Sequence, residues 1–275
     1  MKSTKFLFTL FLLIAGLSTA VAEERIINDM VLISSGTFTM GSPLTELGRH
    51  DYEGPQRQVT LSSFYISRFP VTQADYQEVM GRNPSRYQNI NHPVENVNWF
   101  AAIEYCNTRS IKEGFTPVYT IEENNVTWDR KANGYRLLTE AEWEYACRAG
   151  TVTPFYSGRG MDDAGWHGGN SWHPENRRRQ PHPVGGKRPN NWGIHDMHGN
   201  ILEWCWDFWQ DSYRDAGLTD PIGPPTGDNR NRRVYRGGSW YNESNLARSA
   251  YRFGGNPRLH LDFVGFRLAR NASSD

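Results

Sequence analysis

The stretch NWGIHDMHGNILEWCW, residues 191–206, is the most informative part of this chain. Between apolar residues it places two carboxylates, an amide and two glycines, namely Gly193, Asp196, Gly199, Asn200 and Glu203. Glycine accepts backbone conformations that other residues avoid, and Asp and Asn favour turns. The stretch therefore predicts a tight polar loop between two apolar runs.

Such a loop suits a hard cation. Calcium takes about six to eight oxygen ligands, from carboxylates, carbonyls and water. Here the side chains of Asp196 and Glu203 and the carbonyls of Gly199 and Ile201 are candidate ligands. Residue types alone leave a second interpretation open, in which the stretch is only a polar turn between two buried strands.

Composition limits the classes of function. The 275 residues suffice for one large or two small domains, and 37% are hydrophobic, so a sizeable core is possible. Thirty basic residues balance thirty acidic ones, which gives no general attraction to nucleic acid. Aromatic residues make up 13% of the chain, with ten Trp, which favours an irregular, loop-rich fold.

The N-terminus has the pattern of an export signal. Lys2 and Lys5 precede an apolar run at 6–17, and Ala20 and Ala22 offer a cleavage site. We expect a signal peptide at 1–22, a single mature domain at 23–275, and a periplasmic or secreted protein. The apolar run is shorter than the roughly 20 residues that span a bilayer, so we expect no stable membrane insertion after cleavage. An uncleaved signal anchor is the alternative.

Three helix starts carry side-chain caps. Thr72 with Asp75, and Thr139 with Glu142, match the capping box. Asn98 is placed to cap a third helix that ends near residue 114. Helices are therefore predicted after each of these caps.

Strand patterns occupy much of the remaining chain, and residues 151–190 are predicted as long loops. Two short strands and a turn are predicted in 30–42. Further strands are predicted in 58–69, in a hairpin of 118–121 with 126–128, and in a closing strand through Val264, Phe266 and Leu268.

The chain also holds two arginine clusters and three cysteines. We expect residues 177–179 and the cluster Arg230, Arg232 and Arg233 to be solvated loops, with an anion site as the alternative. Cys106 and Cys147 fall on the apolar faces of predicted helices, which favours packed core thiols over a reactive pair.

Across about residues 30–270 the chain resembles the sulfatase-modifying-factor, or formylglycine-generating-enzyme, domain. Seven ordered segments carry the resemblance: MVLISSGTFTMGS, FYISRFPVTQADYQEVM, HPVENVNWFAAIEYCN, YRLLTEAEWEYACRAG, NNWGIHDMHGNILEW, RVYRGGSW and VGFRLAR. It implies an α+β, C-type-lectin-like fold of the formylglycine-generating-enzyme type, with low regular secondary structure. It also implies a structural calcium held by Asp196, Gly199, Ile201 and Glu203.

Copper is not expected, although the family's oxidases hold copper(I) between two cysteine thiolates and oxidise a cysteine of a sulfatase. The first of those positions falls on Asn242, and no cysteine follows Cys205. Amide and hydroxyl groups are poor ligands for copper(I), so no catalytic residue is assigned. The family's active-site tryptophan corresponds to Leu202, and the disulfide partner that some members offer to Cys147 corresponds to Leu268.

Three functions are then possible. The first is a calcium-stabilised, non-catalytic module that binds a peptide, a glycan, a small molecule or an exported protein. Its predicted ligand-binding residues are Ser239, Trp240, Tyr241, Asn242, Tyr251, Arg252 and Phe253. The second is an oxidoreductase of the same family that acts on a sulfatase or another exported protein without a cysteine pair. The third is a partner subunit that assists an exported enzyme, for which the arginines at 177–179 are a candidate docking surface.

Overall fold

A four-stranded antiparallel sheet joins the two ends of the described chain. The computed structural model describes residues 30–214 and 216–272, so the predicted signal peptide at 1–22 lies outside the described residues. The strand order is β1 (Met30–Ile33), β4 (Phe64–Ser67), β16 (Leu268–Asn271) and β7 (Arg136–Leu137).

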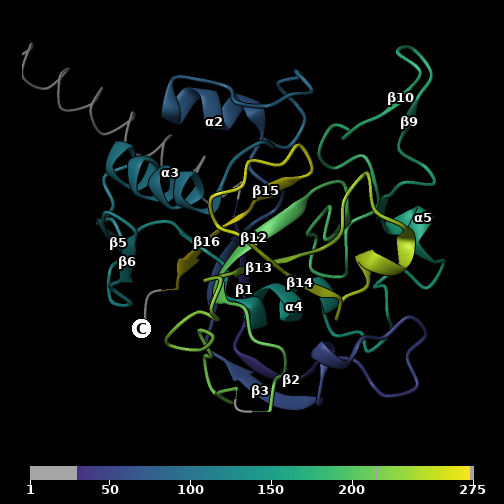
Figure 1. The fold of residues 1–275 in the computed structure, drawn as a ribbon, viewed down its shortest axis with the longest axis horizontal. Helices are drawn as coiled ribbons and strands as arrows, with labels where there is room; N and C mark the ends of the chain where they lie inside the picture. The colour runs from purple at the N-terminus through teal and green to yellow at the C-terminus, as the bar shows by residue number, and fades with distance from the viewer. Residues whose placement is uncertain (1–29, 215, 273–275) are drawn as a thin grey trace, which may run out of the picture.

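A second four-stranded sheet lies at the centre of the molecule (Figure 1). Its order is β14 (Arg252–Gly255), β13 (Arg233–Arg236), β12 (Leu202–Phe208) and β15 (Val264–Phe266), with β12 and β15 parallel. The prediction of one closing strand through Val264 and Leu268 is therefore wrong. Arg267 separates β15 from β16, and the chain changes sheets there.

The other strands of the described chain form short two-stranded sheets. They are β2 (Gly36–Met40) with β3 (Arg57–Leu61), β5 (Tyr119–Glu122) with β6 (Asn125–Trp128), β8 (Gly165–Trp166) with β11 (His198–Gly199), and β9 (Trp172–His173) with β10 (Arg178–Arg179). The strand predicted over 58–69 is interrupted at residues 62–63, so β3 and β4 join different sheets. The predicted hairpin at 118–128 is confirmed as β5 and β6.

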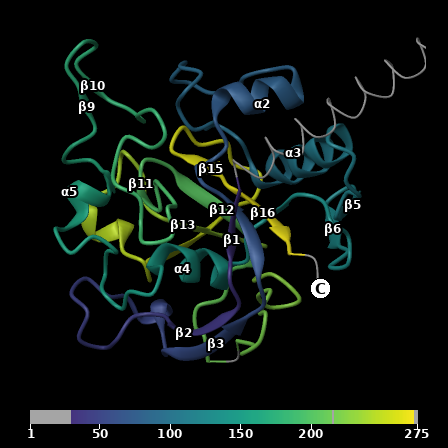
Figure 2. The same ribbon diagram turned by 180° about the vertical axis from the view of Figure 1, so that it is seen from behind.

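The predicted helices are confirmed. They are α2 (Gln73–Met80), α3 (Trp99–Lys112) and α4 (Glu140–Arg148); short helical turns occur as α5 (Met161–Ala164), η1 (Asp51–Glu53) and η2 (Ser244–Ala247). Thr72 and Thr139 form capping boxes, and Asn98 accepts the Ala101 N–H at 2.8 Å. Helices α2 and α3 lie together at one side, whereas α4 packs against β2, β12 and β13 (Figures 1 and 2).

The interior combines two apolar clusters with buried ion pairs. One cluster lies beneath α2 and α3, around Trp99 and Phe266, and the other surrounds α4, around Trp143. Buried arginine–glutamate pairs link the segments between them: Arg136 with Glu142, Arg236 with Glu144, Arg248 with Glu53, Arg252 with Glu140, and Arg267 with Glu203. Within the described residues, no helix has both the length and the apolar character needed to cross a bilayer.

Candidate functional site

The loop at residues 191–206 is built on left-handed backbone. Asp196, Gly199 and Asn200 have φ angles of 56°, 80° and 63°. A Cβ on Gly199 would lie 2.0 Å from the Trp166 carbonyl oxygen, because β11 runs directly beside β8. Only glycine fits at this position. The Asn200 amide donates to the His182 carbonyl at 3.1 Å and accepts the His182 N–H at 3.0 Å, which fixes the loop against its neighbour.

The two predicted calcium carboxylates are both buried in this region. Glu203 accepts hydrogen bonds from the Arg267 guanidinium and, at 2.8 Å, from the Trp143 indole N–H. Asp196 Oδ2 accepts the Gly185 N–H at 2.7 Å, but the nearest donor to Oδ1 is the Asn200 amide at 3.5 Å. Burial raises the pKa of Asp196 to about 6. Asp196 is therefore the less completely compensated of the two carboxylates.

The donor chemistry of this loop fits a hard cation in part. Among residues 30–214 and 216–272, no group of three His, Cys, Asp or Glu side chains is arranged to hold a metal. A calcium ion would depend on Asp196, on Glu203 and on backbone carbonyls, and oxygen atoms of these types are its usual ligands. Glu203 would have to share its carboxylate with Arg267, whereas Asp196 Oδ1 is available.

The loop histidines do not share a metal position. His198 is buried; its Nδ1 lies 2.7 Å from the Ala247 carbonyl, and its Nε2 accepts the Tyr156 N–H at 3.1 Å. His195 Nδ1 lies 2.9 Å from the Lys187 carbonyl. Backbone groups therefore already engage both ring nitrogens of His198.

The position of the family's first copper cysteine is held by an amide. Asn242 Oδ1 accepts the Ser239 hydroxyl at 2.7 Å. Five residues later stands Ala247, which is fully buried in η2. Neither Asn242 nor Ala247 has a thiol group, so these two positions cannot supply a thiolate pair.

All three cysteines are buried free thiols, as predicted for Cys106 and Cys147. Burial raises the pKa of Cys147 to about 12, and it raises the pKa of Cys205 well above the usual range of a thiol. Each is therefore a neutral packing group rather than a soft anionic ligand.

The seven predicted ligand-binding residues do not form one face. Ser239, Trp240, Tyr241 and Asn242 form a turn after β13, where Tyr241 is 62% exposed and stacks on Phe263. Tyr251, just before β14, is buried, and Arg252 at the start of β14 is 0% exposed, because Arg252 pairs with Glu140 in the interior. Phe253 is 46% exposed and stacks on Tyr235, which is a different partner from that of Tyr241.

A polar cavity of about 430 Å³ lies close to the turn that carries Trp240. The Tyr87 ring, which lines this cavity, meets the Trp240 ring edge to face with centroids 5.3 Å apart. Asp262 links the two sides, because its carbonyl accepts the Trp240 indole N–H at 3.1 Å and its carboxylate pairs with Arg86 at 2.7 Å. The cavity is lined by Arg86, Tyr87, Gln88, Asn89, His92, Asn176, Arg178 and Gln180.

This cavity cannot be predicted from the sequence, because its walls come from two segments far apart in the chain. The one signal in the sequence is the arginine cluster at 177–179, whose side chains are exposed as expected, although Arg178 and Arg179 form β10 rather than a loop. In the second cluster the expectation is wrong for Arg233, which is 6% exposed and stacks over the rings of Trp99 and Phe208. Its position on β13 turns it inward.

A family model and several known proteins match this chain over most of its length. The sequence model of the sulfatase-modifying factor enzyme 1-like domain matches residues 17–272. The chain is 36% identical over 276 residues to the chaperone protein LppX of Paenibacillus barcinonensis, covering 89% of this chain and 91% of that protein. It is 30% identical over 315 residues to the formylglycine-generating enzyme of Thermomonospora curvata, covering 90% and 95%.

A solved structure shows the same architecture. Treponema denticola variable protein 1 superposes with a TM-score of 0.79 at 31% identity, covering 88% of this chain and 95% of that one. The α+β fold with few helices and short strands that the sequence predicts is thereby confirmed.

Proposed function

The chain belongs to the sulfatase-modifying factor enzyme 1-like domain family, and on that premise we propose that it is an exported, non-catalytic binding module. The observation that carries this proposal is the replacement of the first copper-ligand position by Asn242, hydrogen-bonded to Ser239. Copper(I) requires soft ligands, and an amide with an alanine five residues later supplies none.

The binding surface that we propose combines the polar cavity beside Trp240 with exposed Tyr241. The cavity offers amides, two arginines and a tyrosine, and Tyr241 offers an exposed ring beside it. Such surfaces suit a polar ligand that carries a flat face or an acidic group, such as a glycan or a peptide. Arg178 and Tyr241 are therefore expected to contact the ligand.

We also propose that the loop at residues 191–206 binds a calcium ion. The ion would be held by Asp196 and Glu203 with the carbonyls of Gly199 and Ile201, where it would brace loops that have few ladder hydrogen bonds. Support comes from the incompletely compensated, buried carboxylate of Asp196.

Binding experiments test the proposed surface. Immobilised panels of oligosaccharides and of peptides would identify a ligand, and titration calorimetry would then compare variants. Tyr241→Ala and Arg178→Ala should each weaken binding at least about tenfold, as expected for anchor residues. Phe253→Ala is the matched control, because this ring is also exposed but stacks on Tyr235 and does not line the cavity. Equal affinity of Tyr241→Ala and wild type would remove the proposed surface.

A second candidate is assistance to a partner protein, which the name of the P. barcinonensis relative favours. The hairpin of β9 and β10 projects from the body of the molecule (Figure 1) and carries the exposed Arg177 and Arg179. We infer that such a partner would dock on this hairpin. Pull-down from the native source with an Arg177→Ala/Arg179→Ala variant should lose the partner, and unchanged capture would count against this role.

A further inference from the structure

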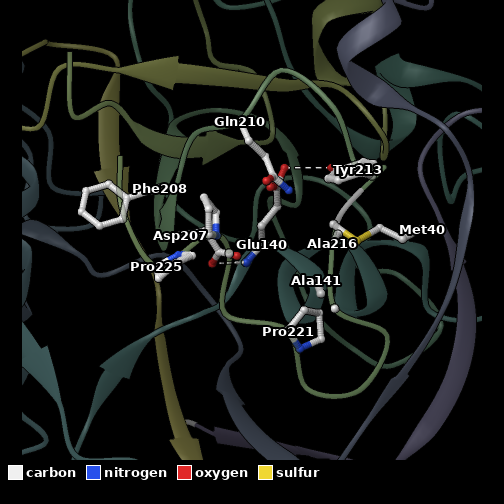
Figure 3. A pocket seen from close by; sticks show the side chains of 13 residues that line it. Met40, Glu140, Ala141, Asp207, Phe208, Gln210, Tyr213, Ala216, Pro221 and Pro225 are labelled. Atoms are coloured by element: carbon white, nitrogen blue, oxygen red, sulfur yellow. Dashed lines mark hydrogen bonds between the residues drawn. The ribbon is translucent and has the colours of Figure 1, made fainter. Parts of the chain in front are cut away.

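An uncompensated carboxyl group lines a cavity of about 230 Å³ near the N-terminus of α4 (Figure 3). It belongs to Asp207 of β12, which is 4% exposed. Asp207 Oδ2 accepts the Glu140 N–H at 2.8 Å. Among the residues that the structure describes, Oδ1 has no hydrogen-bond donor, and no basic side chain lies within ion-pair distance of the carboxyl group.

The second carboxylate of the cavity is fully compensated. Glu140 Oε1 accepts the Arg252 Nε–H at 2.6 Å and the Tyr213 hydroxyl at 2.9 Å, and Oε2 accepts Arg252 Nη2–H at 2.7 Å. Figure 3 shows the two acids side by side at the wall of the cavity. The first N–H of α4 occupies one oxygen of Asp207, and the residue lines the cavity.

The nearby cations Arg252 and Arg233 act on Asp207 from a distance and form no ion pair with it. Arg252 is engaged by Glu140, and Arg233 stacks on Phe208 and donates to the Trp206 carbonyl. Burial and the negative charge of Glu140 raise the pKa of Asp207 to about 8; Glu142 also raises this pKa and Arg252 lowers it. A buried acid in this state is stabilised by a cation that reaches it.

The remaining walls are mostly apolar. Met40, Phe208 and Pro221 line the cavity, and Gly223 closes it over the acid. Gly223 has a φ of 78°, and a Cβ there would lie 2.8 Å from the Asp207 Cβ, so a side chain would displace this wall. The cavity is smaller than the roughly 300–1,000 Å³ of drug-sized sites, which favours a short ligand.

We propose that this cavity binds an alkylammonium group, whose nitrogen donates to Asp207 Oδ1 and whose apolar chain contacts Met40, Phe208 and Pro221. The lone acid supplies the charge, and the apolar walls exclude a strongly hydrated inorganic cation. The group is either a free amine or the side chain of a lysine in a peptide. This site is separate from the proposed surface at Tyr241 and does not depend on it.

Titration calorimetry of the full chain with n-butylammonium and with n-butanol tests the charge requirement. The ammonium ion should bind at least about tenfold more tightly than the alcohol of similar shape. Its binding near pH 7 should release protons, seen as a binding enthalpy that varies with the buffer. Equal affinity of the two compounds, or no binding of either, would overturn the proposal without any variant.

Two variants and a lysine probe complete the test. Asp207→Asn keeps an acceptor for the Glu140 N–H and should lose binding at least about tenfold. Asp211→Asn, an exposed acid four residues later, should bind as wild type does. Unchanged affinity in Asp207→Asn would overturn the assignment to this cavity. Nα-acetyl-lysine amide that binds as tightly as butylammonium would identify a peptide lysine as the ligand class, and weaker binding would identify a free amine.

Discussion

The guanidinium of Arg267 donates to both carboxylate oxygens of Glu203, at 2.8 Å from Nη2 to Oε1 and at 3.0 Å from Nε to Oε2. The same side chain donates to the carbonyls of Ser67 at 3.0 Å and of His195 at 2.8 Å. Arg267 thus connects both four-stranded sheets and the polar loop. It stands where the chain passes from β15 to β16, which explains why this strand pattern changes sheets.

Glu203→Gln should lower the free energy of unfolding by about 3–5 kcal/mol, because it leaves the Arg267 charge buried without its partner. Urea denaturation would measure this loss. Asp51→Asn is the control, since Asp51 is exposed and its pair with Arg49 should contribute less than about 1 kcal/mol. Similar losses in both variants would show that Arg267 does not depend on Glu203.

Thr139→Ala should destabilise the protein by about 1 kcal/mol, since Thr139 Oγ1 accepts the Glu142 N–H at 3.2 Å in the capping box of α4. Thr139→Ser should restore most of the stability. The free energies of unfolding of the two variants would be compared with that of the wild type. A serine variant as unstable as the alanine variant would assign the effect to the lost methyl group instead.

Local signals in the sequence predict the helices well and the sheets less well. A capping box lies within four residues, so Thr72 and Thr139 identify helix starts without knowledge of the fold. The run VGFRLAR alternates without a break, yet Arg267 turns toward Glu203 and divides it between two sheets. The point at which the chain changes sheets depends on Glu203, which lies 64 residues from Arg267 in the sequence. The alternating pattern of the run therefore does not reveal it.

The candidate site could be predicted only in part for the same reason. The loop at 191–206 and the amide at Asn242 are evident in the sequence. Alternation along β14 does not say which face is inside, and it is the ion pair with Glu140 that places Arg252 in the interior while Phe253 stays exposed. The two cavities assemble from segments that are distant in sequence.

Stability should fall as the pH rises from about 4 to about 8, in part because of Asp207. Burial, with the charge of Glu140, raises its folded pKa from the ordinary 3.8 to about 8, so the folded state holds a proton that the unfolded state has lost. This contribution is fully present below about pH 4 and disappears as the pH passes through 8, at most about 1.4 kcal/mol per pH unit. Asp207→Asn cannot ionise and should flatten this slope. Parallel pH profiles for variant and wild type, measured by chemical denaturation, would contradict the assignment.

Removal of calcium should lower the melting temperature by several degrees. An ion present at a hundred times its dissociation constant stabilises the native state by about 2.7 kcal/mol. Thermal melts of the protein in calcium and in chelator would measure the difference. Asp196→Asn should abolish it, because this carboxylate has an oxygen without a close donor, whereas the exposed control Asp51→Asn should retain it. Identical melting temperatures in calcium and in chelator would contradict the calcium site. The Arg267 guanidinium would then be the cation that compensates the carboxylates of this region.

With Asn242 at the first copper-ligand position, we expect this member of the family to be unable to assemble the copper oxidase centre. The most direct measurement is mass spectrometry of a cysteine-containing sulfatase peptide after incubation with the pure protein, copper(I) and oxygen. The T. curvata formylglycine-generating enzyme serves as the positive control. We predict that the peptide keeps its cysteine with this protein while the control converts it. Formation of the aldehyde by this protein above the level without protein would contradict the claim.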